Sequence, residues 1–187
     1  MRKIISKRES KNKQKRNQII VGGILVLVML MSVLGYAFQG DDGSSKKMEY
    51  NGFKFIESEG FWNTNFEGRQ LTFLYNPLEI NEKGVDLKDI KNYKSKPLYI
   101  YSENNPALAE IYRNLEGIYE RIQFACPENK NCEEDIPIKN CEKNFIIIKI
   151  SKENKITQEN NCVFIEGTEE NLAKLSDEFL FEVWGIV

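Results

Sequence analysis

The sequence predicts an α+β protein with a membrane anchor. We expect an N-terminal transmembrane helix, followed by a mixed β-sheet of five or six strands with two amphipathic helices packed on one face. Three observations predict this: a long uncharged apolar run near the N-terminus has the length of a membrane span, short β-branched and aromatic runs separated by polar turns are typical of strands, and two later segments have apolar residues at helical spacing.

The apolar run lies between Asn17 and Gly40, and its 24 residues contain no charge. At about 1.5 Å per residue, a helix of this length reaches roughly 36 Å, which is enough to cross a hydrocarbon core of about 30 Å. Eight basic residues precede the run, and Asp41 and Asp42 follow it. The positive-inside rule therefore predicts a single-pass protein of the cell membrane, with residues 1–16 in the cytoplasm and the C-terminal part outside.

A cleaved secretory signal is the alternative for the same run. The small residues Gly35 and Ala37 stand at the two positions that a signal peptidase recognises. The apolar run is longer than the usual apolar region of a signal peptide, which has about 7–15 residues, so we favour a retained anchor. Both interpretations export the rest of the chain.

The charge of the chain is divided unevenly. Residues 1–40 hold eight basic residues and one acid, so the remainder keeps 18 of the 26 basic residues and 27 of the 28 acids, a net charge of −9. This acidic part lacks the basic face that nucleic acid requires, so we expect no nucleic-acid partner. The chain has no histidine, which excludes a Ser-His-Asp triad and any metal site with histidine ligands.

The exported part is expected to contain a polar tether, residues 41–49, and one domain, residues 50–187. Its first strands, 50–56 and 71–75, are predicted to form a hairpin or meander. A strand at 98–101, a helix and a second strand near 123–126 predict a βαβ unit. For that helix we expect Asn105 as N-cap, Pro106 in the first position and an end near Ile122; Gly117 lies inside it without an evident reason.

The last third of the chain predicts a strand pair and a helix. The strands are 144–150 and 162–166, and we expect them to be antiparallel with a turn between them. The final helix is expected to begin with Thr168 as N-cap and to stop at Gly185. Its apolar side consists of Leu172, Leu175, Phe179 and Val183.

Four cysteines, an even number, all lie on the exported side, where disulfides are the first expectation. Three connectivities are possible. We prefer Cys126–Cys132 and Cys141–Cys162; the second closes the longer loop. Zinc is the alternative, but neither spacing matches the usual C-x2-4-C knuckle, and a redox C-x-x-C motif is absent, so we expect no metal and no other cofactor.

Adjacent acids invite a catalytic interpretation, but the sequence supports a solvated surface for each group. The groups are Glu57 with Glu59, Glu133-Glu134-Asp135, and Asp177-Glu178. The triplet lacks the periodicity of a calcium loop. No glycine-rich phosphate loop and no Gly-x-Ser-x-Gly elbow occurs in the sequence, so we assign no catalytic residue.

Several short motifs occur near the C-terminus: Ile136-Pro137-Ile138, Cys141, Asn161 to Gly167, Asp177 and Gly185-Ile186. In these motifs the chain resembles the ends of uncharacterised archaeal proteins with a membrane anchor. The resemblance covers roughly the last 50 residues. It implies an archaeal envelope protein whose two outer cysteines pair, and it implies no activity.

The function predicted from these observations is a non-enzymatic extracytoplasmic interaction module, an accessory subunit of a larger membrane or envelope assembly with a protein partner. Aromatic residues are the usual anchors of interfaces, so Phe61, Trp62 and Trp184 are the candidates, although Trp184 suits the core equally well. The alternatives are a membrane-tethered hydrolase that uses carboxylates alone and a receptor for a small ligand. The hydrolase requires two acids about 5–10 Å apart in a cleft, and the receptor requires a concave pocket.

Overall fold

The computed structural model describes residues 7–38, 46–80, 87–132 and 135–187. The chain divides into two compact units between Ser44 and Ser45. The first unit contains one helix and the second contains all of the strands. The two units are described separately below.

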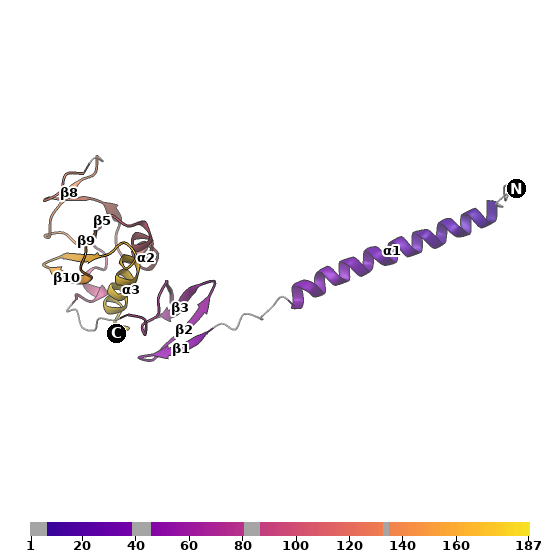
Figure 1. Ribbon diagram of the computed structural model, residues 1–187, viewed down its shortest axis with the longest axis horizontal. Helices are drawn as coiled ribbons and strands as arrows, with labels where there is room; N and C mark the ends of the chain where they lie inside the picture. The colour runs from indigo at the N-terminus through magenta and orange to yellow at the C-terminus, as the bar shows by residue number, and fades with distance from the viewer. Residues whose placement is uncertain (1–6, 39–45, 81–86, 133–134) are drawn as a thin grey trace. The chain divides into compact units, whose positions relative to one another are not determined.

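Helix α1 extends from Lys7 to Phe38 (Figure 1). Its window from Lys15 to Ser32 is apolar and long enough to cross a membrane, and none of that window is buried. The helix begins ten residues before the predicted span because the leader is rich in lysine, arginine and glutamine, which are good helix formers. Its length and composition fit a membrane anchor or an export signal.

The second unit opens with a four-stranded antiparallel meander in the order β1-β2-β3-β4. The strands are β1 (Lys47–Tyr50), β2 (Phe53–Ser58), β3 (Phe61–Phe66) and β4 (Arg69–Phe73). Each of the three two-residue turns ends in glycine and has two positive φ angles, as type I′ hairpin turns require. The predicted tether, residues 41–49, is too long, because β1 begins at Lys47. Residues 61–66, which lie between the two predicted strands, form a further strand.

A five-stranded mixed sheet follows, in the order β10-β11-β9-β5-β6. Its strands are β5 (Leu98–Ser102), β6 (Ile122–Phe124), β9 (Phe145–Ile150), β10 (Lys155–Glu159) and β11 (Cys162–Gly167). A separate short parallel pair consists of β7 (Cys126–Pro127) and β8 (Ile138–Lys139). The expected single sheet is thus two principal sheets, because the meander pairs only with itself among the described strands.

The βαβ unit is confirmed: β5 and β6 are parallel neighbours joined through α2 (Asn105–Leu115). The N-cap is Asn104 and not Asn105, since the Asn104 side chain accepts a hydrogen bond from the Ala107 N–H. The helix also ends earlier than predicted. Gly117 has a φ of +78°, a left-handed conformation that glycine adopts without strain, and it follows the C-cap Glu116. The structure thus explains this glycine as a helix stop.

The expected antiparallel pairing of residues 144–150 with 162–166 is wrong. Strands β9 and β11 are parallel, and β10 lies between them in the sequence but at the sheet edge, antiparallel to β11. The sequence signal of β10 is weak because Ile156 is its only buried residue. The chain therefore reverses direction twice between β9 and β11 rather than once.

Helix α3 extends from Leu172 to Val183, so it begins three residues later than predicted. Thr168 does not cap it through its side chain; its carbonyl accepts from the Leu172 N–H in the preceding turn, and Asn171 is the N-cap. The predicted stop is confirmed, since Gly185 follows the C-cap with a φ of +66°.

Helices α2 and α3 contact each other and form a layer between the two principal sheets (Figure 1). On one side, α3 contacts strands β9, β10 and β11. On the other side, Phe181 packs against Phe55 and Phe73 of the meander, with ring centroids 6.1 and 4.5 Å apart. The helices therefore do not cover one face of a single sheet, as predicted, but are covered themselves, and ten of the twelve residues of α3 are buried.

The outer face of the five-stranded sheet has a second, small apolar cluster consisting of Tyr99, Ala125, Phe145, Ile147 and Cys162. The disulfides lie on this side and join Cys126 to Cys132 and Cys141 to Cys162, which is the preferred pairing. Cys141–Cys162 ties the segment before β9 to the first residue of its neighbour β11.

Removing the disulfide that closes the longer loop should destabilise the domain more than removing the one that closes the shorter loop. The two disulfides span 21 and 6 residues, and loop-closure entropy predicts losses of about 3 and about 2 kcal/mol. We expect the Cys141→Ser/Cys162→Ser variant to have the lower midpoint in a denaturant titration of the full-length chain. Equal midpoints for this variant and Cys126→Ser/Cys132→Ser would contradict the expectation that Cys141–Cys162 contributes more to stability.

Candidate functional site

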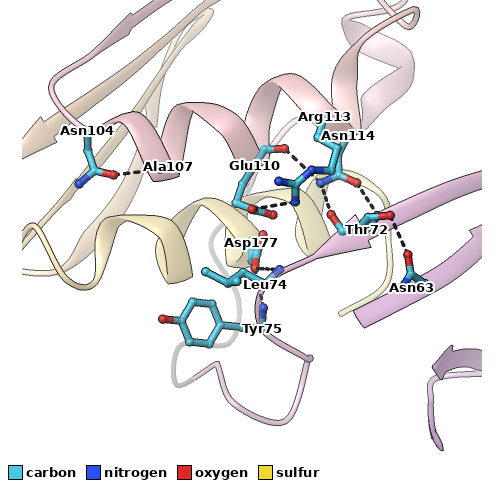
Figure 2. A network of polar contacts seen from close by, with 10 residues as sticks. All are labelled: Asn63, Thr72, Leu74, Tyr75, Asn104, Ala107, Glu110, Arg113, Asn114 and Asp177. Carbon is cyan, nitrogen blue, oxygen red and sulfur yellow. Dashed lines mark hydrogen bonds and ion pairs between the residues drawn. The ribbon is translucent and has the colours of Figure 1, made fainter. Parts of the chain in front are cut away.

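Two buried carboxyl groups meet where α2 and α3 contact each other (Figure 2). Glu110 of α2 is 3% exposed and Asp177 of α3 is fully buried. Glu110 Oε2 and Asp177 Oδ1 are both buried and have no hydrogen-bond partner among the described residues. Glu110 also pairs with Arg113, whose guanidinium nitrogen lies 2.9 Å from the Glu110 Oε1 atom. Glu110 and Asp177 are two of the three buried charged residues in the described part of the chain.

Asp177 and a second polar residue, Asn114 of α2, provide hydrogen-bond partners along the free edge of β4 and just beyond it. The N–H groups of Leu74 and Tyr75 donate to Asp177 Oδ2, at 2.9 and 2.8 Å. The Thr72 N–H donates to Asn114 Oδ1 at 2.9 Å, and Asn114 Nδ2 donates to the Thr72 carbonyl at 2.8 Å. Figure 2 shows the contacts of Asp177 and of Asn114 with this edge. Asn114 therefore replaces a neighbouring strand at Thr72, and Asp177 continues that role beyond the end of β4.

Burial raises the pKa of Asp177 well above its usual value, and the negative charge of Glu110 raises it further. The backbone hydrogen bonds from Tyr75 and Leu74 act in the opposite direction. Burial and the neighbouring carboxyl group thus both favour the protonated form of Asp177, while its Oδ2 accepts two backbone hydrogen bonds.

The expectation that Asp177 and Glu178 lie on a solvated surface is wrong, because both are buried in the layer between the sheets. The other acids fit the expectation better. Glu57 is half-buried and pairs with Lys46 at 3.2 Å, whereas Glu59 and Asp135 are exposed. Glu133 and Glu134 lie outside the described residues.

Four hollows on the described surface have volumes between about 370 and 750 Å³. Neither Glu110 nor Asp177 lines any of these four. A catalytic carboxyl must contact its substrate. The buried pair is thus arranged to hold two helices against a strand, and the arrangement expected of a carboxylate hydrolase is not met by these two acids.

The largest hollow, of about 750 Å³, lies over the outer face of the five-stranded sheet beside the Cys141–Cys162 disulfide. Phe145, Ile147 and Phe164 line its apolar side, and the first two are nearly fully buried. Amide side chains and charged residues form most of the remaining lining. The hollow therefore combines aromatic and aliphatic side chains on one side with polar and charged residues around them.

The three aromatic candidates do not come together. Phe61 lies on the outer face of the meander, half-buried, with the Arg113 guanidinium 4.8 Å from its ring centroid. Trp62, the next residue along β3, points to the opposite face and packs against the core. Trp184 is 5% exposed and packs against Phe66, with centroids 5.2 Å apart. Trp184 is thus a core residue, and Phe61 is the candidate that faces outward.

Sequence reasoning missed Glu110 and Asn114. Both stand at helical spacing with the apolar positions of α2, next to Ile111 and Leu115, and both are buried with them. Polar residues inside an apolar stripe are the available signal, because such groups are buried only with hydrogen-bond partners. The sequence does not show which backbone groups those partners are.

Comparisons of the chain with protein-family models, with curated proteins and with solved structures found no match. The resemblance to archaeal membrane-anchored proteins therefore stays a prediction.

Asp177→Asn should preserve every contact of the buried pair while removing its titration. The amide oxygen accepts from the Leu74 and Tyr75 N–H groups, and the amide nitrogen donates to Glu110. Because the native pKa of Asp177 is raised, the native state holds this proton above the unfolded pKa of about 3.9, and the free energy of unfolding falls as pH rises from there toward the native pKa.

We expect denaturant titrations of the full-length chain between pH 4 and pH 8 to show a weaker decline for Asp177→Asn than for the wild type. Asp177→Ala should lose about 2–4 kcal/mol throughout, because it leaves two N–H groups unpaired and a cavity. Glu120→Gln, at an exposed position, is the matched control and should follow the wild-type profile. An Asp177→Asn profile parallel to that of the wild type would refute the protonated assignment.

Proposed function

We propose that the chain is a single-pass membrane protein whose residues 45–187 form a non-enzymatic interaction module outside the cytoplasm. In this proposal the module is an accessory subunit of a larger membrane or envelope assembly, and the sequence resemblance suggests an archaeal envelope. The observation that supports it most is a helix with an exposed, uncharged apolar stretch on the same chain as a domain with two disulfides.

The helix supports the membrane part of the proposal. Every described side chain from Lys15 to Ser32 is exposed, including Ile19, Met29 and Met31 at 67–75%. Soluble proteins rarely expose a continuous apolar surface of this size, and such surfaces mark contact with lipid or protein. All of the basic residues of α1 precede the apolar stretch, which favours a cytoplasmic N-terminus.

The disulfides support an extracytoplasmic location. Disulfides persist in oxidising compartments and are rare in the cytosol. All four cysteines are paired, and both pairs lie within the second unit. The free thiols of a reduced compartment would leave the small outer cluster around Phe145 without its covalent ties.

The meander provides the surface at which we place the partner. Ile56 is 43% exposed on its outer face, and Phe61 lies on that face beside it. Ser58, Asn63, Gln70 and Thr72 surround the two in a hollow of about 480 Å³. An apolar centre with a polar rim is the usual anatomy of a protein interface.

The anchor is tested by the size and the location of the chain in native membranes. We expect the full-length mass to persist in the membrane fraction after alkaline extraction, and residues 45–187 to be digested by protease added outside sealed, right-side-out vesicles. Ala37→Leu, which blocks signal cleavage, should leave the mass unchanged. A wild-type product shorter than the Ala37→Leu product would show a cleaved signal and would contradict the anchor.

The interface is tested by purification in mild detergent followed by sizing and mass spectrometry. We expect the wild type to migrate with a protein partner in fixed ratio, and Ile56→Ser/Phe61→Ser to weaken that association about 30-fold, because central apolar anchors contribute about 2 kcal/mol or more. Leu78→Ser, which removes an exposed apolar side chain outside this face, should retain the partner. A wild type that migrates alone would contradict the proposal.

A further inference from the structure

A second recess, which we call the Trp184 crevice, lies near the C-terminal end of α3 and has a volume of about 370 Å³. Phe66, Ile118 and Trp184 contribute apolar walls, and Arg69 lies in the lining with them. The lining comes from four parts of the chain: the β3–β4 turn, residues 87–94, the segment after α2 and the end of α3. The volume falls at the small end of the range for ligand sites, about 300–1,000 Å³.

Two buried hydrogen-bond donors belong to residues of this crevice and have no partner in the described part of the chain. They are Trp184 Nε1 and Arg69 Nε. Trp184 as a whole is 5% exposed. Indole and guanidinium nitrogens donate and do not accept, so only an acceptor satisfies them. Both nitrogens are inaccessible to solvent in this conformation. A buried donor without a partner costs about 1–3 kcal/mol, so an acceptor that reaches either nitrogen recovers free energy that the domain otherwise lacks.

The Arg69 side chain is held in place at the crevice. One of its terminal nitrogens donates to the carbonyl of Glu116, the C-cap of α2. No carboxylate pairs with Arg69 or with Lys94, another lining residue, among the described residues. Three acids also lie in the lining, Glu67, Asp89 and Glu182, and Asp89 pairs with Lys91 at 3.8 Å. The crevice thus combines apolar walls with two cations that have no ion pair.

We propose that the Trp184 crevice binds a small amphipathic carboxylate. Its apolar body packs against Phe66, Ile118 and Trp184, and its carboxylate accepts hydrogen bonds from Trp184 Nε1 and Arg69 Nε. Charge-assisted hydrogen bonds to a carboxylate are about twice as strong as neutral ones, which gives the site a preference for acids over alcohols of the same shape. This inference is independent of the interface proposed on the meander, which lies on other residues.

The test uses the intrinsic fluorescence of Trp184. The chain has two tryptophans, so Trp62→Phe leaves Trp184 as the single reporter. The full-length Trp62→Phe chain in lipid nanodiscs is titrated with 4-phenylbutyrate and, separately, with 4-phenylbutanol, which has the same apolar body and no charge. We expect saturable changes in Trp184 emission with 4-phenylbutyrate, at a concentration at least tenfold lower than with 4-phenylbutanol.

Arg69→Gln in the same background should reduce that tenfold preference to about one, because the remaining walls do not distinguish the two compounds. Arg121→Gln, at an exposed arginine outside the crevice, is the control and should retain the preference. If Arg69→Gln lowers the thermal midpoint, Arg69→Lys replaces it; lysine keeps the charge but lacks the Nε–H donor, and the preference should still fall.

Two results would overturn the proposal. One is the absence of saturation by 4-phenylbutyrate up to millimolar concentration, which would mean that water satisfies the two donors. The other is equal affinity for the acid and the alcohol in the Trp62→Phe chain, which would mean that the crevice binds apolar compounds without using Arg69. Loss of preference in both Arg69→Gln and Arg121→Gln would also count against a local role of Arg69.

Discussion

The domain depends on how the free edge of β4 is satisfied. Buried backbone N–H and C=O groups require hydrogen-bond partners, and β4 has a neighbouring strand on one side only. Asn114 supplies both partners at Thr72, and Asp177 supplies the acceptor for the next turn of chain. These contacts fix the position of α2 and α3 relative to the meander more specifically than apolar packing, because hydrogen bonds are directional and apolar contacts are not.

The layered core follows from that placement. With the helices fixed against β4, one side of α3 meets the five-stranded sheet, and Phe181 on the other side meets Phe55 and Phe73. An almost completely buried helix has no solvated face on which to place its acids. Asp177 is consequently buried beside Glu110, and protonation of one member of the pair is the arrangement with the lowest electrostatic cost.

The opposite face of the five-stranded sheet is stabilised differently. Its apolar cluster is small, and the two disulfides lie beside it. Covalent ties restrict the unfolded chain and therefore stabilise a region that buries little apolar surface. One face of the five-stranded sheet thus packs on the main core, which contains the buried polar residues, and the other face carries the small cluster and a disulfide beside it. Neither of the two proposed binding surfaces, the outer face of the meander and the Trp184 crevice, includes a disulfide-bonded cysteine.

The sequence by itself determined the apolar helix, the βαβ unit and most strands, because local spacing, capping and turn chemistry encode them, but it left three cysteine pairings possible. Even the meander had a local signal, the repeated turns ending in glycine. Only the tertiary structure decided that β9 and β11 are parallel, that Trp184 lies in the core, and that Glu110, Asn114 and Asp177 meet at one edge. Periodicity identifies which residues are buried, but their partners come from segments as much as 103 residues away, and no local pattern specifies those.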